Sequence, residues 1–154
     1  MTYKYLSYSI ALTFFSFIVG MMINSVIKKT KFYNNELTNI NLIKSETLNK
    51  LLGVDLVKWI VKNTPFKYFN QKLKLKNKTE KTDLYTLRKE MTNSEIEHLI
   101  GFVFVLIFVC IKFYKTEWQF GLTMIIINLL MNLNPSLLQQ QNKRRIDKLI
   151  KNSS

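Results

Sequence analysis

The sequence is poor in cysteine, proline, glycine and acidic residues, and each shortage excludes a class of protein. The single cysteine, Cys110, excludes an intramolecular disulfide and a cysteine-rich metal site. Four glycines and two prolines among 154 residues argue against a linker-rich or low-complexity chain. Only ten residues are acidic against 23 lysines and arginines, giving a formal charge of +13, yet 47% of the residues are apolar. Soluble domains rarely combine such a charge with long apolar runs, whereas small membrane proteins do.

Three apolar runs are long enough, or nearly so, to cross a membrane: residues 6–27, 96–114 and 118–138. The first is too long for the apolar part of a signal peptide and lacks a small-residue cleavage site after it, so we expect an uncleaved span. Aromatic residues surround the turn between the second and third runs, as is typical of a membrane interface. The sequence therefore predicts a single all-α membrane domain, residues 1–154, with three transmembrane helices.

The cationic residues cluster at one end of each span, and this bias predicts an orientation. They are Lys28, Lys29 and Lys31 after the first span, Arg88 and Lys89 before the second, and Lys143, Arg144 and Arg145 after the third. By the positive-inside rule, the N-terminus lies outside, while region 28–95 and tail 139–154 are cytoplasmic.

The basic cytoplasmic region contains a helical apolar pattern over residues 46–63, which predicts an imperfectly amphipathic helix. This helix either lies among lipid headgroups or packs on its own protein. Pro65 predicts a break near residues 63–64. Residues 72–78 alternate lysine with other residues and could form a short strand, an extended basic strip or a solvated loop. Membrane lipid is the expected partner, and nucleic acid is not, because no nucleic-acid motif is present.

Glu95 and His98 lie three residues apart, so they share one helix face at the mouth of the second span. A carboxylate beside an imidazole can orient the ring, which then activates a hydroxyl as a nucleophile. Two alternatives remain: Thr92 and Glu95 match a capping box at a helix start, and His98 could be an interfacial histidine without a catalytic role. A metal site is not expected, because the other spans lack carboxylates.

A polar stripe follows the third span and steps by four, three, four and three residues: Asn128, Asn132, Pro135, Gln139 and Asn142. At helical spacing these residues share one face, which should contact protein or a wet groove rather than lipid. The stripe could join neighbouring helices through hydrogen bonds, or it could form the wall of a groove for the polar head of an amphiphile. Pro135 cannot donate to the Met131 carbonyl, so the helix should kink or loosen there.

Arg145 admits two interpretations. It could be only a positive-inside anchor, or, together with Asn142, it could bind a carbonyl, carboxylate or phosphate of a substrate.

Two stretches, residues 88–98 and 134–145, together with the hairpin between them, resemble the glycosyl-4,4'-diaponeurosporenoate acyltransferase family of small bacterial membrane proteins. The match carries over to Glu95 and His98 in a Glu-x-x-His pattern, and to Pro135, Gln139, Asn142 and Arg145 in a Pro…Gln-x-x-Asn tail. Lys143 and Gln141 depart from that pattern, which more often has an arginine and an aromatic residue there. The resemblance implies transfer of a fatty acyl group to a sugar hydroxyl in the bacterial cytoplasmic membrane.

Two functional hypotheses follow. In the first, His98 and Glu95 are catalytic, and Asn128, Asn132, Gln139, Asn142 and Arg145 bind a lipid, glycolipid or glycosylated carotenoid-like substrate, with an acyl donor such as a thioester and no other cofactor. In the second, the chain is a non-catalytic membrane subunit, scaffold or assembly factor with a protein partner. A lipid carrier or flippase component is less favoured, because charges do not line the bilayer centre.

Overall fold

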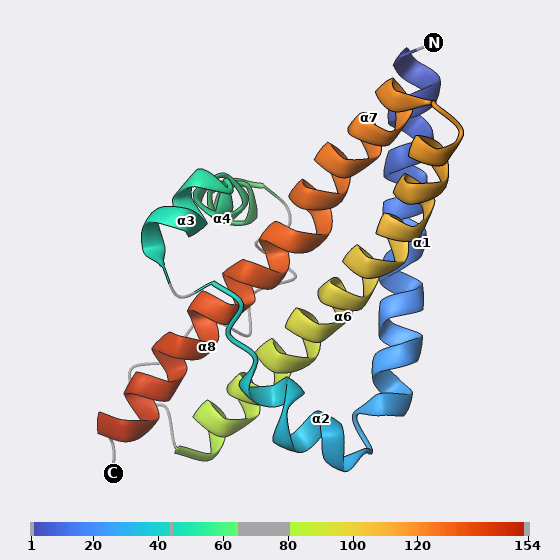
Figure 1. Ribbon diagram of the computed structural model, residues 1–154. Helices are drawn as coiled ribbons and strands as arrows, with labels where there is room; N and C mark the ends of the chain where they lie inside the picture. The colour runs from blue at the N-terminus through green and yellow to red at the C-terminus, as the bar shows by residue number, and fades with distance from the viewer. Residues whose placement is uncertain (1, 44, 65–80, 153–154) are drawn as a thin grey trace.

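The computed structural model describes residues 2–43, 45–64 and 81–152, and every regular element in these ranges is a helix. Figure 1 shows the arrangement of α1 (Thr2–Ile27), α2 (Lys31–Asn35), η1 (Leu37–Asn39), α3 (Glu46–Leu51), α4 (Val54–Asn63), α6 (Lys81–Tyr114), α7 (Trp118–Asn128), η3 (Leu129–Leu133) and α8 (Asn134–Asn152). The all-α prediction is confirmed. The possible strand at residues 72–78 lies outside the described residues.

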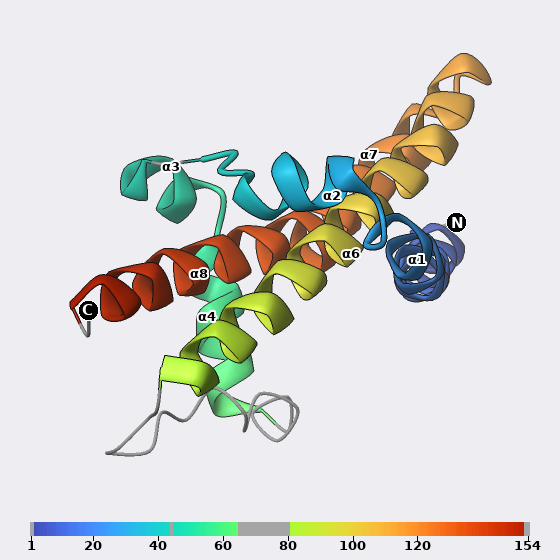
Figure 2. The same cartoon turned by 90° about the horizontal axis from the view of Figure 1, so that it is seen from below.

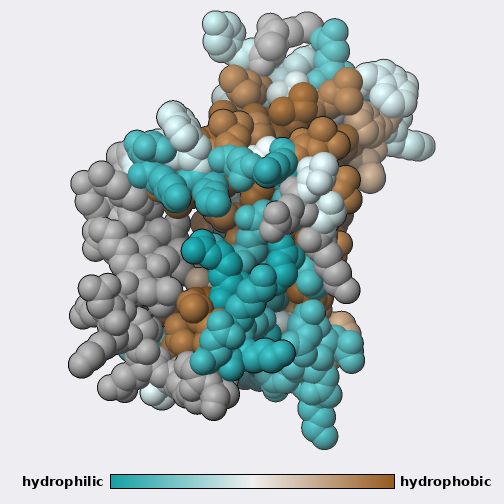
Figure 3. Space-filling view, turned by 90° about the vertical axis from the view of Figure 1, so that its left-hand side faces the viewer, coloured by the Kyte–Doolittle hydropathy of each residue, from teal (hydrophilic) through white to brown (hydrophobic). Residues whose placement is uncertain are grey.

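Three helices are long and apolar enough to cross a membrane: Tyr3–Ile27, Thr82–Tyr114 and the continuous helix Trp118–Asn152. This confirms a membrane protein with three spans, although the second and third helices extend well beyond the predicted apolar runs. Figure 3 shows hydrophobic residues gathered over the upper part of one face, with hydrophilic residues below them. The N-terminus lies at the same end as the α6–α7 turn, and the C-terminus lies at the opposite end (Figure 1).

The apolar half of the bundle packs α1, α6 and α7 together. Val105, Val109, Phe120 and Met124 are buried in one cluster, and the ring of Tyr5 stacks on Phe120 with centroids 4.5 Å apart. Farther along α1, Gly20 lies against the backbone of α6, where an added Cβ would collide with the Glu97 carbonyl oxygen. The absence of a side chain at this glycine therefore sets how closely the two spans approach.

The predicted helix over residues 46–63 is two helices, because Gly53 between α3 and α4 adopts a left-handed conformation with φ 84°. α4 crosses α8 and buries Val54 and Val57 against Leu137 and Leu138 (Figure 2). The helix thus packs on its own protein, the second of the two alternatives. α4 ends at Asn63, as the position of Pro65 predicts.

The capping-box interpretation of Thr92 and Glu95 is wrong, because no helix begins there. α6 starts at Lys81, and Thr92 lies in mid-helix, where its hydroxyl donates to the Arg88 carbonyl over 2.9 Å. The polar first turns of α6 are held on α8 by a buried cluster of Leu84, Met91 and Ile146. This packing stabilises a helix that continues far beyond the apolar run.

The third span contains a π-helical segment, η3, which ends two residues before Pro135. The loosening predicted from the missing proline N–H is confirmed, and its form is a wide turn that accommodates an extra residue. Helical faces after η3 are consequently displaced by about one position. The buried polar positions run through Asn128, Asn132, Ser136, Gln140 and Lys143, instead of continuing through the predicted positions 135, 139 and 142.

Candidate functional site

A band of polar side chains runs between α1, α6 and the η3–α8 helix, and we call it the polar seam. Its members are Ser16 on α1, Glu95 and His98 on α6, and Asn128, Asn132, Ser136, Gln140 and Lys143 on the third span. All except His98 are buried, and His98 is half-buried. Buried polar groups in a membrane protein need partners, so the contacts within this band decide what it can do.

The end of the seam inside the apolar layer joins all three spans through amide hydrogen bonds. The amide nitrogen of Asn132 donates to Ser16 Oγ over 3.0 Å and to Asn128 Oδ1 over 2.8 Å. Asn128 in turn donates to the Phe102 carbonyl on α6 over 3.0 Å. Gly101 makes this approach possible, because a Cβ there would lie 2.9 Å from Asn132 Oδ1. These two amides hold the spans together.

The opposite end of the seam is an ion pair that is almost completely removed from solvent. Lys143 Nζ lies 2.5 Å from Glu95 Oε2, and the two side chains are 5% and 0% exposed. The same ammonium group donates to the carbonyls of Thr38 and Ile40, each over 3.2 Å. The side chain of Gln140 lies near the Glu95 carboxylate without a hydrogen bond to it. The pair therefore fastens α8 to α6 and to the segment that follows α2.

His98 lies between these two ends. Its ring meets Phe17 of α1 edge-on, with centroids 5.2 Å apart, and the side chain of Asn132 reaches toward the same ring. Nδ1 is buried and has no hydrogen-bond partner among the described residues. Glu95 does not hydrogen-bond to His98 within that part of the chain, because its carboxylate is directed to Lys143. The structure thus places the two predicted catalytic residues in one seam without a direct bond between them.

Several other buried polar atoms in and beside the seam lack hydrogen-bond partners within the described residues. They include Glu95 Oε1, Asn132 Oδ1, Ser136 Oγ, both amide atoms of Gln140, both amide atoms of Asn134 and Gln139 Oε1. Each unpaired buried polar group costs roughly 1–3 kcal/mol, so a concentration of them calls for bound water or ligand. Hydroxyl groups, which both donate and accept, match amide and hydroxyl side chains of this kind.

The remaining predicted residues lie beside the seam rather than in it. Gln139 and Asn142 are half-buried on the neighbouring face of α8, and Arg145 is exposed. Sequence reasoning missed Ser16, Ser136 and Gln140, and treated Lys143 only as an anchor. The combination of Pro135 with the amide spacing was the signal available, because a wide turn before the proline moves the polar face by one residue. Within residues 2–43, 45–64 and 81–152, no group of three histidine, cysteine or acidic residues could hold a metal.

Comparison with known proteins gives one result. The family model described as glycosyl-4,4'-diaponeurosporenoate acyltransferase matches residues 29–152, which include α6, the α7–α8 helix and every seam residue except Ser16. No curated protein and no solved structure matches the chain. The match extends over most of the 154 residues and agrees with the three-span architecture. The chain belongs to the glycosyl-4,4'-diaponeurosporenoate acyltransferase family of membrane proteins.

Proposed function

We propose that the protein transfers a fatty acyl group from an activated donor to a hydroxyl of a glycolipid or a glycosylated carotenoid-like acceptor. Family membership supports the reaction class. The single observation that carries the assignment to a site is the buried Nδ1 of His98, which has no hydrogen-bond partner among the described residues, in a seam where several other polar atoms also lack partners there. A general base needs a nitrogen lone pair that the protein leaves available.

In this proposal His98 is the general base. Its neutral ring takes the proton from the acceptor hydroxyl as the hydroxyl oxygen attacks the acyl carbonyl carbon. With a thioester donor, the carbon–sulfur bond then breaks, and the proton passes from the imidazolium ion to the leaving thiolate. The edge-on contact with Phe17 restricts the ring, so the base is positioned before substrate arrives. Glu95 contributes by holding Lys143, and thus α8, next to α6.

The acceptor's hydroxyl groups would occupy the seam. Asn132 Oδ1, Ser136 Oγ and the Gln140 amide provide unpaired donors and acceptors close to η3, and Asn128 fixes the Asn132 amide. Sugar hydroxyls would satisfy these groups, which lipid chains cannot. Gln139 and Asn142 extend the polar surface on the adjacent face. Arg145 is exposed to a water-soluble donor, whose carboxylate or phosphate it could bind.

The proposed site faces the cytoplasm of a bacterium, with the N-terminus outside and the C-terminus inside. The support is the distribution of cations: Lys28 and Lys29 directly follow α1, Arg88 and Lys89 lie in the polar first turns of α6, and the last turns of α8 are basic. This end of the bundle is opposite the α6–α7 turn (Figure 1). A cytoplasmic acyl donor would therefore meet the polar end of the seam directly.

Acyl transfer by the purified protein in lipid nanodiscs, with a radiolabelled acyl thioester and a panel of glycolipid acceptors, tests the proposal. We expect His98→Gln, which removes the base but keeps a polar side chain, to lower turnover at least 100-fold. Glu97→Gln is the matched control: it lies next to His98, and its amide oxygen can still accept from Asn24, as the carboxylate does over 3.0 Å. Equal turnover in wild type and His98→Gln would overturn the role of His98.

A second function, a non-catalytic membrane subunit, is favoured by one observation. Glu95, Asn128 and Asn132 all form side-chain hydrogen bonds between helices, as residues that only hold the helices together would. This reading predicts a stoichiometric protein partner that copurifies from native membranes. It also predicts full biological function of the His98→Gln variant, and loss of function in that variant would exclude it.

A further inference from the structure

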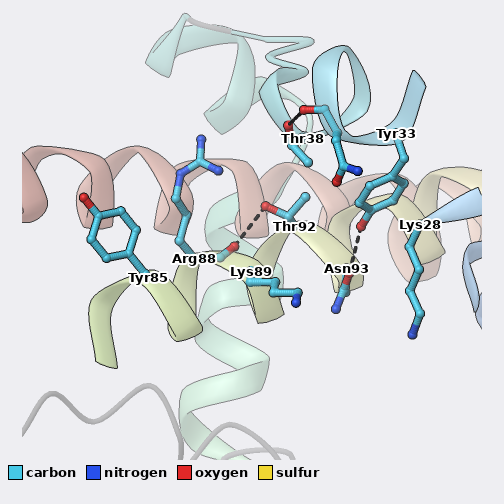
Figure 4. A pocket seen from close by; sticks show the side chains of 9 residues that line it. Lys28, Tyr33, Thr38, Tyr85, Arg88, Lys89, Thr92 and Asn93 are labelled. Carbon is cyan, nitrogen blue, oxygen red and sulfur yellow. Dashed lines mark hydrogen bonds between the residues drawn. The ribbon is translucent and has the colours of Figure 1, made fainter. Parts of the chain in front are cut away.

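A second feature lies outside the polar seam: a cavity of about 430 Å³ between α2 and the polar first turns of α6. This volume lies within the usual range for small-ligand sites. Figure 4 shows the cavity with Lys28 from the end of α1, Tyr33 from α2, and Tyr85, Arg88, Lys89 and Asn93 from α6. Nothing in the acyl-transfer step described above uses these residues.

Among the described residues, the lining of the cavity carries positive charge and no negative charge. Lys28, Arg88 and Lys89 contribute to it, and no carboxylate of that part of the chain does. Arg88 is already fixed by Asp147, with Nε 2.5 Å from Oδ1. Lys28 and Lys89 have no ion-pair partner within the described part of the chain. Lys28 and Lys89 thus bring two ammonium groups to one cavity, and an anion there would be attracted to both.

The neutral polar groups of the cavity also favour an anion. The Tyr33 hydroxyl donates to Asn93 Oδ1 over 2.7 Å, which fixes the amide and leaves its NH₂ group as a donor. Burial, followed by the charge of Glu97, raises the pKa of Tyr33, so this phenol stays protonated. In Figure 4 the ammonium groups of Lys28 and Lys89 and the Asn93 amide lie toward the same side of the cavity. The two ammonium groups and the Asn93 NH₂ group are donors, as a ligand with several acceptor oxygens requires.

We propose that this cavity is a phosphate-binding site at the polar end of the spans, with Lys28 and Lys89 as its principal cations. The phosphate could belong to a phospholipid headgroup or to a soluble acyl thioester such as a coenzyme A ester. Lys89 and His98 are nine residues apart on one continuous helix, or about 13 Å along its axis. The pantetheine arm of coenzyme A separates its phosphates from the thioester by a long flexible chain, whereas phospholipid phosphates lie a few bonds from their esters. The spacing therefore favours the thioester.

The existence of the phosphate site does not depend on the chemistry at His98, whereas the assignment of a thioester donor to it rests on the proposed function. The test measures binding alone, with full-length protein in nanodiscs. Coenzyme A is titrated against protein in zwitterionic lipid, with pantetheine, which lacks the phosphates, as the negative probe. Native mass spectrometry then counts phosphatidylglycerol and phosphatidylcholine molecules retained by the protein.

The variant is Lys28→Gln/Lys89→Gln, and Lys148→Gln/Lys151→Gln near the end of α8 is the control with the same loss of charge. We expect the first double variant to weaken coenzyme A binding at least tenfold, and the control to change it less than twofold. If phosphatidylglycerol retention falls instead, again only in the first variant, the site binds the headgroup. Identical behaviour of the two double variants with both probes would overturn the phosphate site. Coenzyme A binding without any acyl transfer would leave the site intact and refute the proposed function.

Discussion

Removing the cation from the buried Glu95–Lys143 pair should be among the most damaging single changes in this protein. Lys143→Met keeps most of the side-chain volume but leaves the Glu95 carboxylate, which is 0% exposed, without its cation. It also takes a donor from the carbonyls of Thr38 and Ile40. Breaking a buried ion pair on one side costs about 3–5 kcal/mol, so we expect a loss of that size in the free energy of unfolding.

The double variant Glu95→Gln/Lys143→Met separates the cost of the pair from the cost of each side chain. With both charges gone, the uncompensated buried carboxylate that makes the single variant costly is absent. We expect the double variant to lie within about 2 kcal/mol of wild type and to be more stable than Lys143→Met. The exposed pair of Arg88 and Asp147 is the matched control, because Asp147 is 44% exposed. Asp147→Asn should cost about 1 kcal/mol or less.

Unfolding in mixed micelles by titration with sodium dodecyl sulfate, followed by the fluorescence of Trp59 and Trp118, measures these differences. The reasoning is refuted if Lys143→Met costs less than about 1 kcal/mol, since the carboxylate would then have water or another partner. It is equally refuted if the losses in Glu95→Gln and Lys143→Met simply add in the double variant, because two residues in contact should be coupled.

Three further predictions concern helix packing and pH. Gly20→Ala should lower the unfolding free energy by about 2 kcal/mol, because the new Cβ meets the backbone carbonyl of Glu97, which has no rotamer to change; an unchanged unfolding midpoint would contradict this close approach. Gly101→Ala should cost about 1 kcal/mol by the same measurement, because Asn132 is a side chain and can give way in part; a loss larger than that of Gly20→Ala would contradict the argument. The raised pKa of Tyr33 predicts that the contribution of this phenol to stability is constant below about pH 10 and falls as the pH rises above it, since the unfolded chain loses the phenol proton first. Tyr33→Phe should reduce that fall, and an identical pH profile would show that another group causes it.

The three membrane-spanning helices could be predicted from the sequence because the length of the apolar runs decides them. The three spans needed only the apolar runs and their charged ends. The start of α6 could not be predicted in this way. The Thr92–Glu95 pattern is typical of a helix N-terminus. However, Leu84 and Met91 pack against Ile146, and the helix extends back to Lys81. Packing between residues far apart in the sequence therefore determined where α6 begins, and the local capping pattern did not.

The candidate site was predicted only in part, and Pro135 explains why. Its effect on the helix was foreseen, but the choice between a kink and a wide turn depends on how the neighbouring spans pack. The wide turn moved Gln140 and Lys143 onto the buried face in place of Gln139 and Asn142. Lys143 lies where the positive-inside rule places a surface cation. Nothing in the sequence therefore indicated that its side chain pairs with Glu95.

The hold of Lys143 on the Thr38 and Ile40 carbonyls has a consequence for biosynthesis. Thr38 and Ile40 lie 105 and 103 residues away from Lys143 along the chain. Arg144 makes similar contacts with the Asn41 side chain and the Ile43 carbonyl. The ribosome makes the chain from its N-terminus. The hydrogen bonds that hold the segment after α2 therefore cannot form until nearly the whole protein has been made. The wall of the phosphate cavity is therefore completed only after the last span has entered the membrane, and a nascent chain carries its lysines there without a formed site.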